Sequence, residues 1–374
     1  MIGVAKPSGN QHDSEPGEHG RSARSGASAR RVLVTGGGGY IGAVLVRRLL
    51  DQGYAVRVLD TLYWGKKPLA EVLDRIELIQ GDIRDVEDSW IAGVDSVIHL
   101  AGLSNDPTAE YDPQANWEMN ALGTERIAAV AKRVGVRRFT FGSSCSVYDG
   151  LPNGQVYTEE APVNPKGAYA EGKLYAEARL RELADENFSP VILRQATVFG
   201  FSPRMRYDLV VNTFVKDAMQ AGKLQIHGDG LIRRPLVDVA DVAQAHIACL
   251  EAPEDAVRGE TFNVVQQNYQ VKELAQLAAS ALKTESYEVD VKFVSAPPRV
   301  RDYECSNEKM TSVVGYTPQR TVPMAIAYMI SWIRSNGYMA FDNPRFYNIR
   351  WMELLKEQGK VPATPAQTVA RAHV

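Results

Sequence analysis

Tyr169 and Lys173 stand four residues apart in the stretch PKGAYAEGK, a spacing that places both side chains on one face of a helix. A tyrosine hydroxyl has an unperturbed pKa of about 10, so it exchanges protons near neutral pH only when that pKa is lowered. A lysine ammonium one helical turn away supplies a positive charge that favours the phenolate. The pair therefore indicates proton-transfer chemistry, although the same spacing alone also fits two side chains sharing a solvated helix face.

A second chemical signal lies more than a hundred residues upstream, between Arg30 and Asp60. This segment is typical of a strand, a glycine-rich turn, a helix and a second strand, because an apolar run precedes the turn and apolar residues at helical spacing follow it. Asp60 stands at the end of the second strand. An acid at this point accepts hydrogen bonds from both ribose hydroxyls and repels a 2′-phosphate, which favours NAD over NADP.

The turn itself, TGGGGYIG at residues 35–42, has the composition that a dinucleotide pyrophosphate needs. Its first glycine permits the tight turn, its middle glycine lets backbone N–H groups approach the pyrophosphate, and its last glycine lets the helix pack closely on the strand. The helix N-terminus adds N–H donors and partial positive charge. The cofactor contacts predicted in this turn are Gly36, Gly39, Tyr40, Ile41 and Gly42.

Composition restricts the class of protein. The chain has 374 residues, of which 45% are hydrophobic, enough for a substantial buried core. A net charge of -3 offers no attraction to nucleic acid, and no apolar stretch approaches the length that spans a membrane. Cys145, Cys249 and Cys305 follow no zinc or redox spacing, so we expect free thiols in a reducing cytoplasm and no metal site.

Strands and helices alternate from residue 31 to about residue 201, and several strands are apolar throughout, including PVILRQATVFG at residues 190–200. This pattern predicts the α/β class, with a Rossmann-type, doubly wound parallel sheet. The later, more proline-rich half predicts a smaller C-terminal α/β substrate lobe that closes over the sheet's C-terminal edge. The expected domains are a disordered leader (1–29), an NAD-binding domain (30–200), a partly interleaved substrate lobe (201–355) and a flexible tail (356–374).

The glycine spacing, Tyr169 and Lys173 together resemble the extended branch of the short-chain dehydrogenase/reductase superfamily, over roughly residues 30 to 340. Further landmarks match in order: GDIRD from Gly81, HLAGLSND from His99, MNALGT from Met119, FGSSCSVYDG from Phe141, LRQATVFG from Leu193, and GDGLIRRPLVDVADVAQA from Gly228. Their order is similar to that of the nucleotide-sugar epimerases and dehydratases. The resemblance implies an NAD-dependent enzyme acting on a nucleotide-diphosphate sugar.

The resemblance implies a role for each matching position. Ser144, four residues before the tyrosine of the Val-Tyr landmark, would bond the reacting substrate oxygen, Tyr169 would exchange its proton, and Lys173 would lower the tyrosine pKa and bond the nicotinamide ribose. The other implied cofactor contacts are Asp82, Ile83, Leu100, Ala101, Gly102 and Asn120. The implied substrate contacts are Ser104, Ser144, Thr197 (where epimerases carry an asparagine), Asn212, Arg234 and Arg299, the two arginines being suited to a diphosphate.

The leading interpretation is a nucleotide-sugar epimerase that works at C4 through a 4-keto intermediate and keeps its NAD. A nucleotide-sugar 4-ketoreductase or dehydrogenase shares every catalytic residue and differs only in exchanging the cofactor. A 4,6-dehydratase is less favoured, because such enzymes carry an acidic pair where this chain has Cys145 and Ser146. We expect Cys145 to be a packed thiol rather than an acid or base.

A non-catalytic NAD-binding scaffold is the remaining alternative, and it is disfavoured because both Tyr169 and Lys173 are present. The resemblance further implies a homodimer. It would form through the helix that carries Tyr169 and the neighbouring segment near residues 113–134, as a four-helix bundle.

Overall fold

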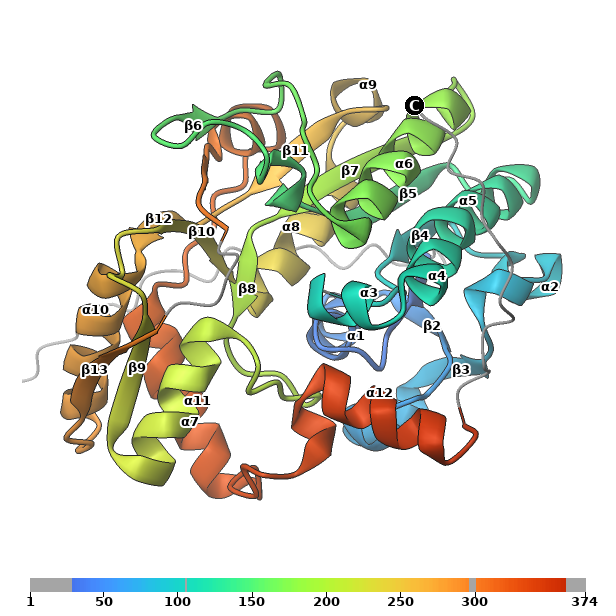
Figure 1. Cartoon of the computed structure of the whole chain (residues 1–374). Coiled ribbons are helices and arrows are strands. Elements are labelled where there is room, and N and C mark those ends of the chain that lie inside the picture. The colour runs from blue at the N-terminus through green and yellow to red at the C-terminus, as the bar shows by residue number, and fades with distance from the viewer. Residues whose placement is uncertain (1–28, 105, 296–300, 361–374) are drawn as a thin grey trace, which may run out of the picture.

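The computed structural model describes residues 29–104, 106–295 and 301–360, and it is built around one large sheet (Figure 1). Seven strands run in the order β11-β7-β5-β4-β1-β2-β3, each parallel to its neighbours. This confirms the predicted Rossmann-type sheet. The strands are β1 (Arg31–Thr35), β2 (Ala55–Asp60), β3 (Ile76–Gln80), β4 (Ser96–His99), β5 (Arg138–Ser144), β7 (Ser189–Gln195) and β11 (Thr261–Val264).

Helices cover both faces of this sheet because its central strands are apolar on both sides. Val34 of β1 belongs to a cluster with α1 and α8, whereas its neighbour Leu33 belongs to a cluster with α5 and α6. Successive strand residues point to opposite faces, so one short apolar run serves both layers. The helices are α1 (Gly42–Asp51), α8 (Val239–Glu251), α5 (Gly123–Arg133) and α6 (Ala168–Leu183).

A smaller lobe follows β7 and has its own apolar core. We expected residues 190–200 to form one strand, but the chain leaves the large sheet at Ala196, and the next three residues pair with β10 in a second sheet. That break carries the chain from one lobe to the other. The lobe contains the sheet β12-β10-β8, the pair β13-β9 and three helices: β8 (Thr197–Phe199), β9 (Lys223–His227), β10 (Arg233–Asp238), β12 (Gln267–Gln270), β13 (Asp290–Val294), α7 (Val210–Ala221), α10 (Val271–Thr284) and α11 (Val322–Ser335).

The two lobes share segments. β11 returns to the edge of the large sheet beside β7, and the C-terminal helix α12 (Asn348–Glu357) lies against the first lobe (Figure 1). Met352 and Leu355 of α12 pack with Leu103 and Met119. Residues 348–355, part of the predicted and partly interleaved substrate lobe, therefore also contact the first lobe. Residues 1–28 of the expected leader and 361–374 of the expected tail lie outside the described residues.

Within the described ranges, the structure has no helix that is both long and apolar enough to cross a membrane. In the same ranges, no three His, Cys, Asp or Glu side chains are grouped so that they would hold a metal ion.

Candidate active site

The glycine turn between β1 and α1 is packed tightly on its inner side. Gly36 has a φ of +72°, and a Cβ added there would lie 2.8 Å from the backbone nitrogen of Ala101. A Cβ on Gly42 would lie 2.1 Å from the carbonyl oxygen of Gly36. A Cβ on Gly39, by contrast, would meet only that same carbonyl within 4 Å among the described residues beyond its chain neighbours. The backbone thus excludes a side chain most strongly at Gly36 and Gly42, and Gly39 has fewer close neighbours, with that carbonyl oxygen 3.0 Å from its added Cβ.

Tyr40 and Ile41 follow Gly39 and lead into α1, which has Ile41 at its N-cap. The Tyr40 hydroxyl donates to the carbonyl oxygen of Gly200 at 2.5 Å, and the Tyr40 carbonyl accepts from Ser202 Oγ at 2.7 Å. Burial raises the pKa of Tyr40 well above its ordinary value, so the phenol stays protonated. Tyr40 therefore ties the glycine turn to the loop that enters the second lobe.

Asp60 ends β2 directly beside the glycine turn. Its carboxylate accepts from the backbone nitrogen of Gly38 at 2.8 Å and from that of Leu62 at 2.7 Å. Burial raises the pKa of Asp60, and the two N–H groups act in the opposite direction. Each carboxylate oxygen accepts one of these bonds and retains a further acceptor site. The arrangement leaves Asp60 able to accept hydroxyl groups from a ribose.

Asp82 and Ile83 follow β3, as predicted, but both are engaged with the protein. The Asp82 carboxylate forms a two-point ion pair with Arg84, at 3.1 Å to Nε and 2.7 Å to Nη2. The Ile83 side chain is buried, and its Cδ1 lies where a Cβ on Gly123 would come within 2.8 Å. Any contact of these two residues with an adenine would therefore come from the backbone or from the remaining carboxylate acceptor sites.

The segment Leu100 to Gly102 crosses directly beneath the glycine turn. The Leu100 nitrogen donates to the carbonyl oxygen of Thr35 at 3.1 Å, and the Ala101 nitrogen donates to Thr35 Oγ1 at 3.2 Å. Asn120 lies fully buried behind this segment, and its Nδ2 donates to the carbonyl oxygen of Leu103 at 2.8 Å. A Cβ on Gly102 would lie 2.1 Å from Asn120 Oδ1. Asn120 thus holds the segment in place from behind.

Tyr169 and Lys173 lie on the first turns of α6, facing the C-terminal end of β5. Lys173 Nζ lies 5.9 Å from the centre of the Tyr169 ring and donates to the carbonyl oxygen of Gly142 at 2.8 Å. Burial lowers the pKa of Lys173 to about 8, although the nearby carboxylate of Glu177 raises it. The lysine is therefore protonated at neutral pH, which gives the charge that the tyrosine needs.

Ser143 and Ser144 are adjacent at the end of β5, and the structure separates their roles. The Ser143 hydroxyl is buried and donates to Glu177 Oε1 at 2.6 Å. Ser144 is half-buried, and its hydroxyl accepts only a 3.2 Å contact from the Ser146 nitrogen among the bonds that the structure describes for it. The Ser144 hydroxyl therefore has hydrogen-bonding capacity left for a ligand, and its catalytic role stays a prediction.

Cys145, next in the chain, points away from this site. It is fully buried, and its thiol donates to the carbonyl oxygen of Arg194 at 3.1 Å. The position that carries an acidic residue in 4,6-dehydratases is thus occupied here by a thiol packed into the core. This agrees with the packed-thiol interpretation.

A buried ion pair supports α6 one turn beyond Lys173. Glu177 is fully buried and accepts from Arg194 Nη2 at 2.7 Å and Nε at 3.0 Å. Arg194 also donates to the Tyr148 hydroxyl at 2.7 Å. Burial acts to raise the pKa of Glu177, but the Arg194 and Arg181 guanidiniums hold it below its ordinary value. Sequence reasoning missed this pair, because its members lie on a helix and a strand with no recognisable spacing.

The structure divides the predicted substrate residues among different places. Asn212 is fully buried, and its amide is engaged with the Gly200 nitrogen (2.9 Å), the Tyr40 hydroxyl (3.1 Å) and the Arg206 carbonyl (2.8 Å). These bonds organise the loop between the lobes, and the substrate contact expected of Asn212 stays a prediction. Thr197 lies half-buried on β8.

Arg234, on β10, donates from Nη1 to the carbonyl oxygen of Arg301 at 3.2 Å. Both guanidiniums act on the buried phenol of Tyr303, so two arginines meet in this part of the second lobe. Arg299, the predicted partner of Arg234, lies outside the described residues. We did not predict a role for Arg301 from the sequence. Its position two residues after Arg299 could have indicated it as a second candidate for the same contact.

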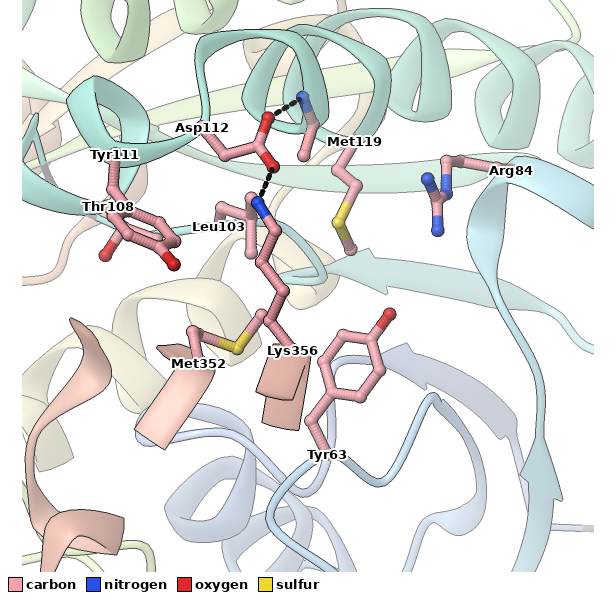
Figure 2. Close-up of a pocket in the computed structure, with 10 residues that line it drawn as sticks. Tyr63, Arg84, Leu103, Thr108, Tyr111, Asp112, Met119, Met352 and Lys356 are labelled. Carbon is pink, nitrogen blue, oxygen red and sulfur yellow. Dashed lines mark hydrogen bonds and ion pairs between the residues drawn. The ribbon is translucent and has the colours of Figure 1, made fainter. Parts of the chain in front are cut away.

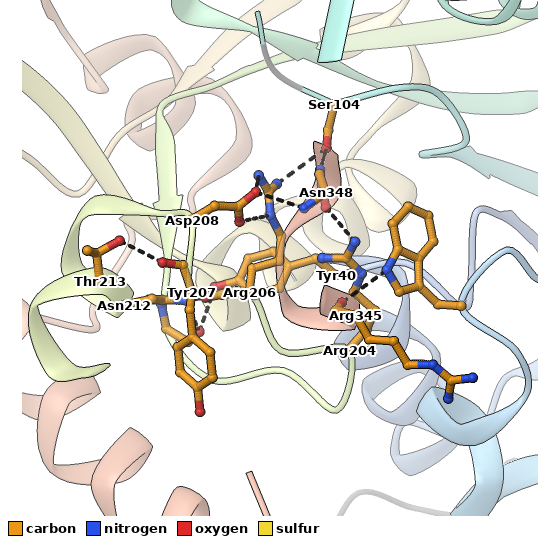
Figure 3. Close-up of polar contacts among 12 residues, drawn as sticks. Tyr40, Ser104, Arg204, Arg206, Tyr207, Asp208, Asn212, Thr213, Arg345 and Asn348 are labelled. Atoms are coloured by element: carbon orange, nitrogen blue, oxygen red, sulfur yellow. Dashed lines mark hydrogen bonds and ion pairs between the residues drawn. The ribbon is translucent and has the colours of Figure 1, made fainter. Parts of the chain in front are cut away.

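Ser104 belongs to a polar cluster that the sequence did not reveal (Figure 3). Its hydroxyl accepts from Asn348 Nδ2 at 2.7 Å and from Arg206 Nη1 at 3.3 Å. Arg206 is paired with Asp208, with Nε 2.8 Å from Oδ1. Arg204 donates to Asn348 Oδ1 in the same cluster. In the stretch PRMRYD, which begins at Pro203, every second residue is charged, and this pattern could have indicated a polar cluster in the loop.

Comparison with known proteins gives consistent results. Residues 32–264 match the model of the NAD dependent epimerase/dehydratase family. The chain is 31% identical over 321 residues to a UDP-glucose 4-epimerase from Mycolicibacterium smegmatis, covering 82% of this chain and 99% of that protein. It is also 31% identical over 260 residues to UDP-glucuronic acid decarboxylase 1 from Xenopus tropicalis, covering 66% of this chain and 60% of that protein.

Among solved structures, the fold is similar to that of MoeE5 in complex with UDP-glucuronic acid and NAD. The TM-score is 0.70 at 26% sequence identity, and the match covers 81% of this chain and 99% of MoeE5.

The buried lysine predicts a specific pH dependence of stability. Because the folded-state pKa of Lys173 (about 8) is below its ordinary value of 10.5, the unfolded chain binds more protons between these pH values, and stability rises with pH through this window. The variant Lys173→Met lacks this effect. We expect the unfolding free energy of the wild type, relative to Lys173→Met, to increase by about 2 kcal/mol between pH 7 and pH 10.

Urea unfolding at several pH values measures this difference. The control is Lys223→Met at the exposed start of β9, whose difference from the wild type should stay constant over the same range. If the difference in unfolding free energy between Lys173→Met and the wild type also stayed constant, the pKa of Lys173 would not be lowered in the folded protein.

Proposed function

This chain belongs to the NAD dependent epimerase/dehydratase family, and on that premise we propose that it is a nucleotide-sugar epimerase that inverts C4 through a 4-keto intermediate. The observation that carries the proposal is the arrangement at the end of β5. There Ser144 is available, and Lys173 lies buried one turn beyond Tyr169 on α6. A serine, a tyrosine and a lysine in this arrangement can transfer a proton to and from one hydroxyl oxygen of a substrate.

The chain is an enzyme of the NAD-dependent type, and its residues fit that cofactor. A side chain at Gly36 or Gly42 would clash with backbone, and a pyrophosphate would be held at Gly39, which has fewer close neighbours. Asp60, fixed by two backbone N–H groups, would hold the adenosine ribose. Bound NAD supplies the hydride acceptor and donor that oxidation and reduction at one carbon require.

The chain's own residues account for the proton side of the reaction. Tyr169 takes the proton of the 4-hydroxyl and later returns it, while Ser144 donates a hydrogen bond to the same oxygen. Lys173 favours the phenolate through its charge, and the carbonyl oxygen of Gly142 fixes its position. Arg234 and the neighbouring Arg301 would hold the diphosphate, so the sugar can turn while its nucleotide stays anchored.

Two observations bear on other reactions. At the dehydratase position, Cys145 is buried with its thiol bonded to a backbone carbonyl, so elimination lacks its acid and base there. The similarity to a UDP-glucuronic acid decarboxylase supports decarboxylation as a second candidate, because that protein is also 31% identical, although over 260 residues rather than the 321 matched by the epimerase. The products distinguish these two reactions.

We predict that the purified protein converts at least one nucleotide sugar to its C4 epimer without added cofactor. The measurement is incubation with a panel of nucleotide hexoses and hexuronic acids, followed by chromatography, NMR of the sugar and absorbance of reduced nicotinamide. A pentose product with carbon dioxide would establish the decarboxylase instead. Stoichiometric formation or consumption of reduced cofactor, with no change of configuration, would identify a dehydrogenase or ketoreductase.

Tyr169→Phe should abolish turnover and leave NAD bound. Proton transfer by a positioned side chain typically contributes about 10²–10⁴-fold to the rate, and phenylalanine keeps the ring but cannot exchange the proton. The matched control is Tyr175→Phe on the same helix, whose hydroxyl donates to Glu125 at 2.8 Å outside the site. Turnover in Tyr169→Phe within a few-fold of the control would remove Tyr169 from the mechanism.

We further propose a cytoplasmic homodimer formed through α6 and the helices beside it, α4 (Pro113–Asn116), η3 (Trp117–Leu122) and α5. Leu122, an apolar residue of η3 on this surface, is 42% exposed. Leu122→Lys should convert the dimer to a monomer in sedimentation velocity. Val313→Lys, at a residue 40% exposed elsewhere, should not. A monomeric wild type would contradict the proposal.

A further inference from the structure

Arg204, in the loop between the lobes, is a buried cation without an acidic partner. Only 4% of it is exposed, and no carboxylate of the described residues forms an ion pair with it. Its Nη1 has no hydrogen-bond partner among those residues, while its Nη2 donates to Asn348 Oδ1. A buried, incompletely satisfied guanidinium costs stability, so such a group is a candidate for a binding role.

The surroundings of Arg204 place it at the cofactor cleft. Its guanidinium lies 4.0 Å from the centre of the Trp64 ring, just after β2. It interacts electrostatically with Tyr40 of the glycine turn and with Asp60 at the end of β2. These two residues belong to the regions expected to hold the pyrophosphate and the adenosine ribose. Arg204 therefore lies where the two parts of the dinucleotide would join.

The C-terminal segment holds Arg204 in this position (Figure 3). Asn348, at the start of α12, accepts from Arg204 and is itself fixed, since its Nδ2 donates to Ser104 Oγ at 2.7 Å and its backbone nitrogen to Asp208 Oδ2 at 3.1 Å. The Trp64 indole, on which Arg204 stacks, donates to the carbonyl oxygen of Arg345 at 3.2 Å. Both the charge and its aromatic support thus depend on residues 345–348.

The next turns of α12 border a small pocket (Figure 2). Trp351 Nε1 donates to the carbonyl oxygen of Tyr63 at 2.8 Å, and Lys356 Nζ lies 3.8 Å from Asp112 Oδ2. Met352 and Lys356 line this pocket, and Tyr63 and Arg84 line it as well. Tyr63 lies within electrostatic range of both Asp60 and Asp82, the acids expected beside the adenosine. The helix therefore covers the adenosine end.

We propose that Arg204 is a cofactor-binding residue that pairs with a phosphate of the dinucleotide, and that α12 is a strap that positions Arg204 and closes the adenosine end of the cleft. The proposal rests on NAD being the cofactor in the proposed function. A planar guanidinium binds phosphate oxygens through two parallel donors, and its attraction is strengthened where water is excluded. Pairing with a phosphate would satisfy Nη1 and compensate the buried charge.

The first test compares Arg204→Gln, Arg204→Lys and the control Arg350→Gln, which removes an exposed arginine of α12 that stacks on Tyr347. Affinities for NAD and ADP-ribose are measured by titration calorimetry on protein freed of cofactor. We expect Arg204→Gln to weaken both by about tenfold or more, because a charge-assisted hydrogen bond is lost. Arg204→Lys should recover part of the loss, and the control should match the wild type.

A merely structural role predicts a different pattern. Lysine would then be no better than glutamine, and the loss of affinity would accompany a lower melting temperature of the cofactor-free protein. We expect instead that Arg204→Gln melts no lower than the wild type, because a buried, unpaired charge is removed. Unchanged NAD affinity, or equal losses for lysine and glutamine with a lowered melting temperature, would overturn the assignment.

The second test concerns the strap. Asn348→Ala should weaken NAD binding and speed its dissociation, and the double variant with Arg204→Gln should lose no more affinity than Arg204→Gln alone. Full additivity would mean that Asn348 does not act through Arg204. These measurements need no sugar turnover, so a different reaction in the panel leaves them valid, whereas a wild type that does not bind NAD contradicts the proposed function itself.

Discussion

The buried ion pair between Glu177 and Arg194 is the interaction on which the geometry of the candidate site depends. It joins α6, which carries Tyr169 and Lys173, to β7, and through Ser143 it reaches β5 next to Ser144. Two charges taken out of water are tolerated only when their remaining donors and acceptors are satisfied. The Tyr148 hydroxyl and the Ser143 hydroxyl meet that requirement. Removing one partner of such a pair typically costs about 3–5 kcal/mol, so helix and strands are held in one register.

Lys173 takes advantage of this fixed frame. Burial makes its charge costly, and the carboxylate of Glu177 one turn further along reduces that cost only in part, which leaves its pKa at about 8. A lysine in water would keep its proton more firmly but would lose much of its effect on a neighbouring phenol to solvent screening. Burial of Lys173 therefore lowers the stability of the folded protein but strengthens the electrostatic effect of its ammonium on Tyr169.

The sequence predicted features that depend on neighbouring residues. The glycine turn, Asp60 and the apolar strands were predicted because tight turns and buried strands leave local patterns. The bonds of Asn212 could not be predicted from the residues around it. We expected its side chain to contact the substrate, but its amide is hydrogen-bonded to the Gly200 nitrogen and the Arg206 carbonyl oxygen, twelve and six residues earlier. The docking of α12 was missed for a related reason, because Arg204 and Asn348 meet across 144 residues of chain, and neither position shows its partner in the sequence.

The loop from Gly200 to Asp208 connects the segments that would bind the dinucleotide to the C-terminal helix α12. It bonds to the glycine turn at Tyr40 and to α12 at Asn348, so the expected adenosine end of the cleft is bounded by segments that hold one another. Arg234 and Arg301, which we propose as ligands for the diphosphate of the sugar, lie on and beside β10, where Arg234 donates to the carbonyl oxygen of Arg301. On these assignments, α12 and Arg204 would enclose the dinucleotide, whereas residues of the second lobe would hold the diphosphate of the sugar. Such enclosure of the dinucleotide would suit an enzyme that regenerates its cofactor in every turnover, because that enzyme has no need to exchange it.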